Sequence, residues 1–247
     1  MASQAVIRIL SSQDDLFHTA ADEFATLAQS AVQARGKFCV ALSGGSTPRG
    51  LFQLLASGVH PEIPWDKVYF FFGDERYVPK DVPESNYRMA NEALLSKVRA
   101  AHVFPVPTEE KDAETAAAAY ERTLIEFFHL APGEFPRFDL VLLGLGPDGH
   151  TASLFPGSAA LEEKKRLVVA NWVEKFKTYR ITFTFPVLNH GACVTFLVSG
   201  SEKTTALHSI FEDGADLPAR RVQPVDGSLV WLIDRSAGEG LAIAKKA

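Results

Sequence analysis

The clearest indication of the fold is the segment Phe38-Cys39-Val40-Ala41-Leu42-Ser43-Gly44-Gly45-Ser46-Thr47-Pro48. Its first five residues are apolar without alternation, which is typical of a strand buried on both faces of a sheet. The polar loop that follows contains two glycines, and residues 49–56 then have helical spacing. A buried strand that passes through a short loop into a helix is the repeating unit of α/β proteins.

The same unit recurs along the chain. Apolar runs predict further strands at residues 6–10, 68–72, 138–143, 167–173, 181–185, 194–199 and 229–233. Helical spacing predicts helices at residues 14–35, 85–98, 113–128, 202–211 and 237–244. No linker or low-complexity tract divides the 247 residues. We therefore expect a single three-layer α/β/α domain over residues 1–247, with a mostly parallel, Rossmann-like sheet.

Composition and charge limit the classes of partner. The net charge of −5 argues against a general nucleic-acid binder, which needs a basic face. The two cysteines, Cys39 and Cys193, lie in apolar runs and are expected to be buried, reduced thiols. The chain opens without the pattern of a signal peptide, and its apolar runs are too short for a membrane span. We expect a cytoplasmic protein with neither nucleic-acid nor membrane partners.

Ligands of parallel sheets bind beyond the carboxyl ends of the strands, so the loops that follow strands are the candidate binding sites. In the first such loop, Gly44 and Gly45 allow a ligand close to the backbone. Thr47 is expected to cap the following helix, with Pro48 at its first position, and the helix N–H groups can attract a phosphate together with Ser46. A plain capped turn explains the same residues equally well, and neither a P-loop nor a dinucleotide fingerprint is present.

Charged residues follow the strand at 68–72. Asp74, Glu75 and Arg76 come directly after it, and charges in that position are costly to bury unless they are paired. Asn86 and Arg88, at the start of the next predicted helix, can add polar contacts from the same rim. A solvated surface cluster is the competing interpretation.

The glycine-rich turn after residues 138–143 carries Asp148 and His150. An imidazole beside a carboxylate suits a general base, because a histidine with the ordinary pKa of about 6.5 is mostly neutral at pH 7. The alternative is a turn in which both side chains only cap the next segment. No metal-binding spacing such as HExxH or paired CxxC occurs, and there is no GxSxG elbow for a serine nucleophile.

Two further cations follow or precede strands. Lys203 lies at the start of the helix after Ser199-Gly200, where the helix dipole disfavours a cation unless an anion is present. Arg180 precedes the strand at 181–185. Taken alone, each is more simply a solvated surface residue.

Together these motifs resemble the 6-phosphogluconolactonase family. The resemblance rests on Ser43–Pro48, Gly73–Arg76, Glu84–Arg88, Gly144–Gly157 and Arg180-Ile181-Thr182, which occur in the family's order and span most of the chain. It implies hydrolysis of 6-phospho-D-glucono-1,5-lactone to 6-phospho-D-gluconate in the oxidative pentose phosphate pathway. It implies no cofactor and no catalytic metal.

The resemblance also implies roles for individual residues. His150 would activate water, Asp148 would orient or tune it, and Arg76 or a backbone N–H would stabilise the oxyanion. The substrate would be bound by Gly44, Gly45, Ser46, Thr47, Asp74, Asn86, Arg88, Arg180 and Lys203, with the phosphate at Gly45–Thr47 and Lys203 and with Arg180 as a helper. Asp74 would contact sugar hydroxyls or hold Arg76. The expected partner is a small sugar-phosphate lactone, with the chain acting as a monomer or small homo-oligomer.

Two other functions remain open. The glucosamine-6-phosphate deaminases of the same superfamily share similar motifs but carry a glutamate five residues beyond the histidine, where this chain has Phe155. Their Asp-Glu-Tyr is here Asp74-Glu75-Arg76. Both departures favour the lactonase. A sugar-phosphate-sensing module without turnover is the third possibility, and it would normally carry a DNA-binding segment.

Overall fold

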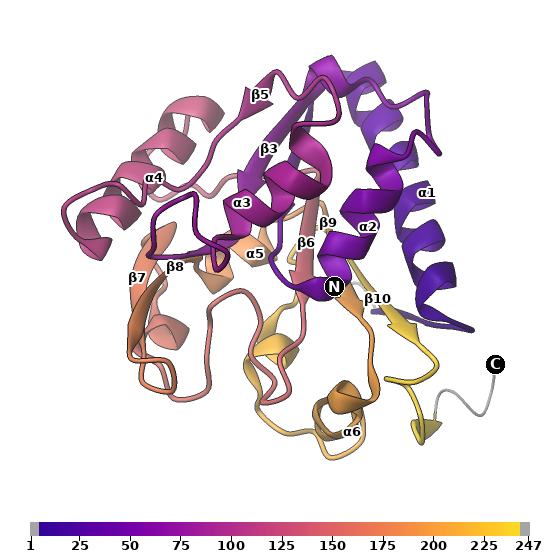
Figure 1. Ribbon diagram of the computed structural model, residues 1–247. Coiled ribbons are helices and arrows are strands. Elements are labelled where there is room, and N and C mark those ends of the chain that lie inside the picture. The colour runs from indigo at the N-terminus through magenta and orange to yellow at the C-terminus, as the bar shows by residue number, and fades with distance from the viewer. Residues whose placement is uncertain (1–4, 243–247) are drawn as a thin grey trace.

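A seven-stranded sheet forms the centre of the computed structural model, which describes residues 5–242 (Figure 1). In spatial order its strands are β1 (Val6–Leu10), β10 (Ser228–Asp234), β9 (Cys193–Val198), β6 (Leu140–Gly144), β2 (Phe38–Leu42), β3 (Val68–Phe72) and β5 (His102–Val103). Every neighbouring pair is parallel. The predicted α/β fold with a mostly parallel sheet is confirmed.

The helices lie on the two faces of the sheet according to the direction of the crossovers. The connections from β1 to β2, β3 and β5 run toward one edge of the sheet, and those from β5 to β6, β9 and β10 return. Right-handed crossovers then place the early helices on one face and the later helices on the other. The early helices are α1 (Gln13–Arg35), α2 (Ser46–Ala56) and α3 (Asn86–Ala90); the later helices are α4 (Ala113–Phe128), α5 (Phe185–Asn189) and α6 (Thr204–Phe211).

Shorter turns complete the helical segments. A π-helical turn, Asn91–Leu95, continues α3, and 3₁₀ turns occur at Trp65–Lys67, Ala159–Glu162, Ser201–Lys203 and Pro218–Arg221. The helix predicted at 237–244 is wrong over its described part, because residues 235–240 form turns. Residues 243 and 244 of that prediction lie outside the described residues.

A second, antiparallel sheet stands beside the first. It contains β4 (Asp74–Arg76), β8 (Thr178–Phe183) and β7 (Val168–Val173), in that order. Helix α4 packs against β7 and β8 (Figure 1). The strand predicted at residues 167–173 is β7, but the strand predicted at 181–185 overlaps β8 only at residues 181–183, since α5 begins at Phe185. The separate sheet was not predicted, because an apolar run does not say which strand it will pair with.

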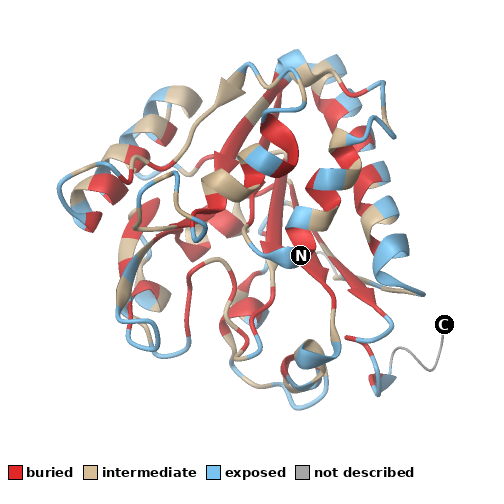
Figure 2. Cartoon of the chain, in the orientation of Figure 1, coloured by how far each residue is buried: buried red, intermediate tan, exposed pale blue. Residues whose placement is uncertain are grey.

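Aromatic side chains fill much of the core between the sheet and α4. The ring of Phe71 stacks on Phe104 with centroids 4.6 Å apart and meets Phe138 edge-on at 5.3 Å. Figure 2 shows the central strands buried along their length. Cys39 and Cys193 are both buried free thiols, as predicted.

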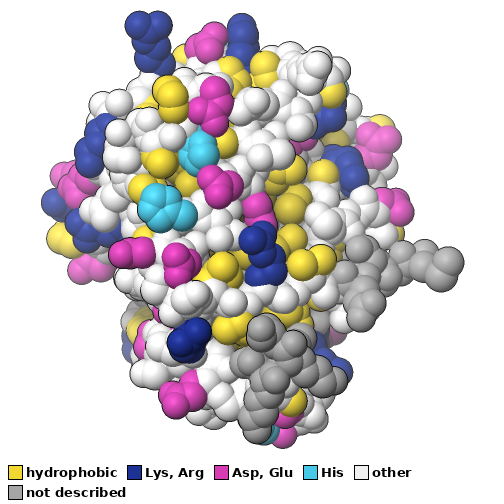
Figure 3. Space-filling model, turned by 90° about the vertical axis from the view of Figure 1, so that its right-hand side faces the viewer, with side chains coloured by type: hydrophobic (Ala, Val, Ile, Leu, Met, Phe, Trp, Pro, Cys, Tyr) yellow, Lys and Arg dark blue, Asp and Glu magenta, His cyan; other side chains and the backbone are white. Residues whose placement is uncertain are grey.

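The surface carries charges of both signs. On the face turned to the viewer in Figure 3, lysine and arginine side chains are scattered among aspartates and glutamates. Within residues 5–242, no helix is both long enough and apolar enough to span a lipid bilayer.

Tyr120 ties α4 to the end of β3. Its fully buried hydroxyl accepts a hydrogen bond from the Phe72 N–H at 2.8 Å and donates to the Phe104 carbonyl at 3.1 Å. We predict that Tyr120→Phe lowers the free energy of unfolding by about 1–3 kcal/mol, because a buried N–H loses its partner. Urea denaturation measures this change. Tyr69→Phe is the control, since no hydrogen bond involves the Tyr69 hydroxyl in the described chain; equal effects of the two variants would contradict the prediction.

Candidate active site

A pocket of about 200 Å³ opens where the loops after β2 and β6 diverge. Strands β2 and β6 are neighbours, but the chain leaves them toward opposite edges of the sheet. Such a switch point leaves a crevice beyond the strand ends. The pocket is lined by Ser43, Gly44, Gly45, Ser46, Thr47, Pro48, Asp74, Arg76, Asn86, Gly144, Leu145, Gly146, Pro147, His150, Ala152, Arg180, Leu197 and Lys203.

A larger cavity, of about 1080 Å³, lies beside the ends of β1 and β10. Its buried carboxylate, Asp234, is already occupied by hydrogen bonds from Ser199, Ser236, Gly200 and Ala237. The smaller pocket is therefore the better candidate site, because it gathers a histidine, Lys203 and two arginines that form no ion pair with an acidic side chain of residues 5–242.

The loop after β2 presents the N-terminus of α2 to the pocket. The helix begins at Ser46, earlier than predicted, with Gly45 as its N-cap at φ 105°. The prediction that Thr47 caps the helix is wrong, because Thr47 is already inside it and no side chain caps it. Its first turn also lacks an acidic residue. The positive end of the helix dipole is thus available to an anion.

Asp74 joins three segments of the site. Its buried carboxylate accepts a hydrogen bond from the Ser153 hydroxyl at 2.6 Å, and its carbonyl accepts one from the Asn86 side-chain amide at 2.9 Å. A Cβ at Gly44 would lie 1.9 Å from Asn86 Oδ1, so Asn86 needs the glycine. Asp74 forms no ion pair with Arg76 within residues 5–242.

Glu75 holds the start of α3. Its carboxylate is only 1% exposed and accepts hydrogen bonds from the Ser85 hydroxyl and from the N–H groups of Arg76, Asn86 and Tyr87. Burial raises the pKa of Glu75, and the N–H donors offset part of that rise. Sequence reasoning gave Glu75 no role. Only the short separation in sequence between Glu75 and Ser85-Asn86 indicated this role. The contacts themselves form only when the intervening loop folds back.

Two arginines face each other across β4 and β8. Arg76 is the register partner of Arg180, and the Nε atom of each is buried without a hydrogen-bond partner. Arg76 Nη1 donates to the Glu84 carbonyl at 2.5 Å, and no acidic side chain of residues 5–242 forms an ion pair with either arginine. Burial, and then the charge of Arg76, lower the pKa of Arg180. Like charges directly opposite are destabilising, so this pair is suited to an anion that would lie between them.

His150 is held by Asp148. The Nδ1 atom of His150 lies 2.5 Å from Asp148 Oδ1. Burial acts to raise the pKa of Asp148, but its hydrogen bond with His150 and the charge of that ring outweigh it, so the pKa is lowered. A Cβ at Gly146 would lie 2.0 Å from Nδ1, so only glycine leaves room for the ring. With Nδ1 facing the carboxylate, Nε2 has no partner in the described chain and can act as a base.

A family model described as glucosamine-6-phosphate isomerases/6-phosphogluconolactonase matches residues 11–231. The chain belongs to this family.

Individual relatives lie on the lactonase side of the family. A 6-phosphogluconolactonase of Nostoc sp. is 43% identical over 242 residues, covering 96% of this chain and 98% of the relative. A 6-phosphogluconolactonase of Synechocystis sp. is 47% identical over 216 residues, covering 85% and 88%. The structure of a 6-phosphogluconolactonase from Trypanosoma cruzi superposes with a TM-score of 0.87 at 32% identity, covering 98% of each chain. The family predicted from the sequence is confirmed.

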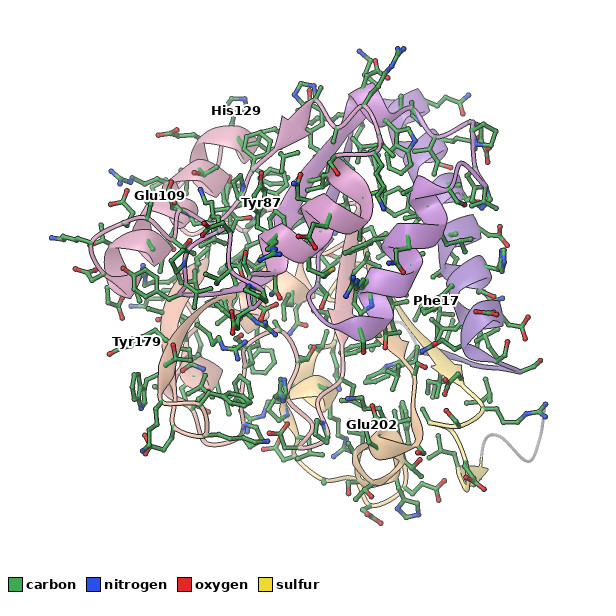
Figure 4. The ribbon with its side chains drawn as sticks, viewed as in Figure 1. Phe17, Tyr87, Glu109, His129, Tyr179 and Glu202 are labelled. Atoms are coloured by element: carbon green, nitrogen blue, oxygen red, sulfur yellow. The ribbon has the colours of Figure 1, made fainter. Side chains whose placement is uncertain are left out.

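Lys203 completes the lactonase-family pocket from the side of α6. It ends the 3₁₀ turn Ser201–Lys203 and is mostly buried, with Glu202 Oε1 3.6 Å from its Nζ. In Figure 4, Glu202 marks the α6 side of the region and Tyr179 the β7–β8 side. Lys203 and the Arg76–Arg180 pair therefore reach the pocket from different elements.

The structure brings together all the predicted site residues except two. Asp148 does not line the pocket but reaches it through His150. Arg88 lies outside it, where it donates to Glu92 at 2.7 Å and to the Asp81 carbonyl at 2.6 Å. Arg88 follows Asn86 by two residues, which turns it about 200° around the helix, so we drop it from the binding set.

Among the residues that the structure describes, no group of three or more His, Cys, Asp or Glu side chains is placed to hold a metal ion.

We predict that Arg180→Met makes the unliganded protein more stable while it impairs activity. Methionine keeps most of the side chain's length but removes one of two like charges in register, a change worth roughly 0.2–1 kcal/mol for cross-strand pairs. Denaturant unfolding in phosphate-free buffer measures the effect. Arg99→Met, at an exposed arginine, is the control and should change nothing. A loss of stability specific to Arg180→Met would show that this arginine holds the fold rather than a ligand.

Proposed function

We propose that this chain hydrolyses 6-phospho-D-glucono-1,5-lactone to 6-phospho-D-gluconate, in the oxidative pentose phosphate pathway, and that it does so as one domain. One observation carries the proposal: a single pocket contains the carboxylate-oriented His150 together with Lys203 and two arginines that have no acidic partner within residues 5–242. The substrate has matching groups, an electrophilic carbonyl at one end and a phosphate at the other.

The phosphate is assigned to the N-terminus of α2 and Lys203. Gly45, Ser46 and Thr47 present uncapped backbone at the positive end of an 11-residue helix. Lys203 adds a charge to the pocket from the turn that precedes α6. Holding the phosphate in this way orients the carbonyl toward His150 and lowers the entropic part of the barrier.

The reaction begins when His150 Nε2 takes a proton from water. The hydroxide oxygen bonds to the lactone carbonyl carbon, and the carbonyl electrons move onto oxygen to form a tetrahedral oxyanion. Collapse of this intermediate re-forms the carbonyl and breaks the bond to the ring oxygen, which takes the proton from the imidazolium. Asp148 stabilises the imidazolium and keeps Nε2 directed to the water.

The oxyanion is assigned to Arg76, with Arg180 beside it. Both guanidinium groups lack an acidic partner in residues 5–242, so they are free to meet charge that develops in the transition state. Neutralising this charge also relieves the repulsion between the two arginines.

Deamination of an amino-sugar phosphate fits the pocket less well. The deaminases carry a glutamate five residues beyond the histidine that assists proton transfer. At that position this chain has Phe155, which stacks on His150 with centroids 4.0 Å apart. A phenyl ring transfers no proton.

The separate roles proposed for Lys203 and His150 provide the first test. Lys203→Ala should lower kcat/KM on the phosphorylated lactone about 10- to 150-fold, mainly through KM, because one charge-assisted contact is lost. His150→Gln should lower kcat by about 10²- to 10⁴-fold, the usual contribution of a general base. Lactone disappearance is followed with a no-enzyme control.

A non-phosphorylated gluconolactone serves as the matched control substrate. Wild type and Lys203→Ala should hydrolyse it about equally poorly, because it lacks the group that Lys203 binds. An equal loss on both substrates would move Lys203 away from the phosphate, and an active His150→Gln would refute the mechanism.

The pH profile tests the pairing of His150 with Asp148. The rate should fall on acidification as the base becomes protonated. The Asp148 carboxylate favours the imidazolium, as its own lowered pKa indicates, so Asp148→Asn should move this acid limb to lower pH and reduce kcat. Rate measurements from acid to neutral pH decide the point. A limb that stays in place in Asp148→Asn, or that survives in His150→Gln, would assign the base to another group.

A further inference from the structure

We propose that Phe155 is a positioning residue for the lactonase reaction: its ring fixes the plane of the His150 imidazole while Asp148 fixes the Nδ1 side. This inference rests on the proposed function, since it concerns how the base is held. The stacked pair of rings, with centroids 4.0 Å apart and planes 22° from parallel, carries it.

The chain makes a tight turn to bring Phe155 back over His150. Ala152 adopts a left-handed φ of 47°, which is unfavourable for a residue with a side chain, and Leu154 N–H donates to the Thr151 carbonyl at 2.9 Å. The Thr151 hydroxyl donates to the Gly144 carbonyl at 2.9 Å. The turn is therefore anchored to the end of β6, and Phe155 cannot move independently of the pocket.

A second anchor fixes the middle of the same turn. The Ser153 hydroxyl donates to Asp74 Oδ2 at 2.6 Å, and the Ser153 N–H donates to the Thr182 hydroxyl at 3.2 Å. Both partners belong to the antiparallel sheet, in β4 and β8. The turn that carries Phe155 is thus held by both sheets.

Asp148 and Phe155 impose complementary restraints. One hydrogen bond to Nδ1 leaves the imidazole free to tilt about the axis of that bond. A ring stacked on its face removes this freedom, and the missing side chain of Gly146 provides the space into which Nδ1 and Cε1 fit. Nε2 then has one direction, as proton transfer to a bound water requires.

The β7–β8 hairpin supports Phe155 from outside. Phe176, in the hairpin turn, meets Phe155 edge-on at 6.0 Å and lies 5.2 Å from the guanidinium carbon of Arg180. Lys175 Nζ lies 3.6 Å from Asp148 Oδ2. Phe155 is accordingly 6% exposed, whereas Phe176 is 47% exposed. The rings connect the base, His150, with the arginine pair on β4 and β8.

The test compares two phenylalanine–histidine stacks in the same chain. Phe135 stacks on His190 with centroids 4.7 Å apart, away from the pocket, so Phe135→Leu is the matched control. Phe155→Leu should lower kcat on the phosphorylated lactone about 10- to 100-fold, the scale of a small misplacement of a catalytic group, with KM little changed. Phe155→Tyr, which keeps the ring, should restore most of the rate, and Phe135→Leu should leave it unchanged.

Proton NMR supplies a readout that does not depend on turnover. The His150 Hε1 signal, assigned with His150→Gln, should show an aromatic ring-current shift in wild type that Phe155→Leu removes. If Phe155→Leu does not fold, a wild-type Hε1 signal without that shift overturns the proposal by itself. A normal kcat in folded Phe155→Leu also overturns it, as does equal loss of rate in Phe135→Leu.

Failure of the function itself would look different. A wild-type protein that does not hydrolyse the lactone, or an active His150→Gln, contradicts the proposed reaction while the ring-current shift remains. An active wild type, an inactive His150→Gln and a fully active Phe155→Leu contradict only the positioning role.

Discussion

The site depends on the parallel pairing of β2 and β6 at the point where the crossovers reverse direction. Because the chain leaves these neighbours toward opposite edges, the loops that follow cannot pack on each other and a crevice stays open between them. One loop provides a helix N-terminus and the other provides the histidine. The proposed separation of a phosphate end from a reacting end thus follows from one feature of sheet topology.

The antiparallel sheet provides the two arginines of the pocket. Its register places Arg76 opposite Arg180, an arrangement that is unfavourable without an anion, and the fold sustains it with neighbouring contacts. Glu75 anchors the strand to α3, and Phe176 lies over the Arg180 guanidinium. Local repulsion is tolerated where a ligand can remove it, which is typical of functional sites.

Much of the fold was predictable because buried strands have a simple signature. The strands predicted at residues 6–10, 38–42 and 68–72 coincide with the observed β1, β2 and β3. The unbroken apolar runs of β2 and β3 are typical of strands covered on both faces, whereas β1 contains Arg8 and lies at the edge of the sheet. The start of α2 was predicted too late, because threonine and proline are typical of a cap and a first helical position. In the structure the helix begins at Ser46, and Thr47 and Pro48 both lie inside its first turn. Arg88 was assigned to the pocket because proximity in sequence to Asn86 does not reveal the side of the helix on which a residue lies.

By itself, the sequence determined the alternation of strands and helices, the loops that carry chemistry and the family to which the chain belongs. These are local properties, set by apolar runs, glycines and motifs within a few residues of each other. Only the tertiary structure decided that Arg76 meets Arg180, that Ser153 binds Asp74 and that Phe176 supports Phe155. Each of these contacts joins segments that are separated in the sequence. They depend on strand register and on the geometry of turns, which the apolar pattern does not encode.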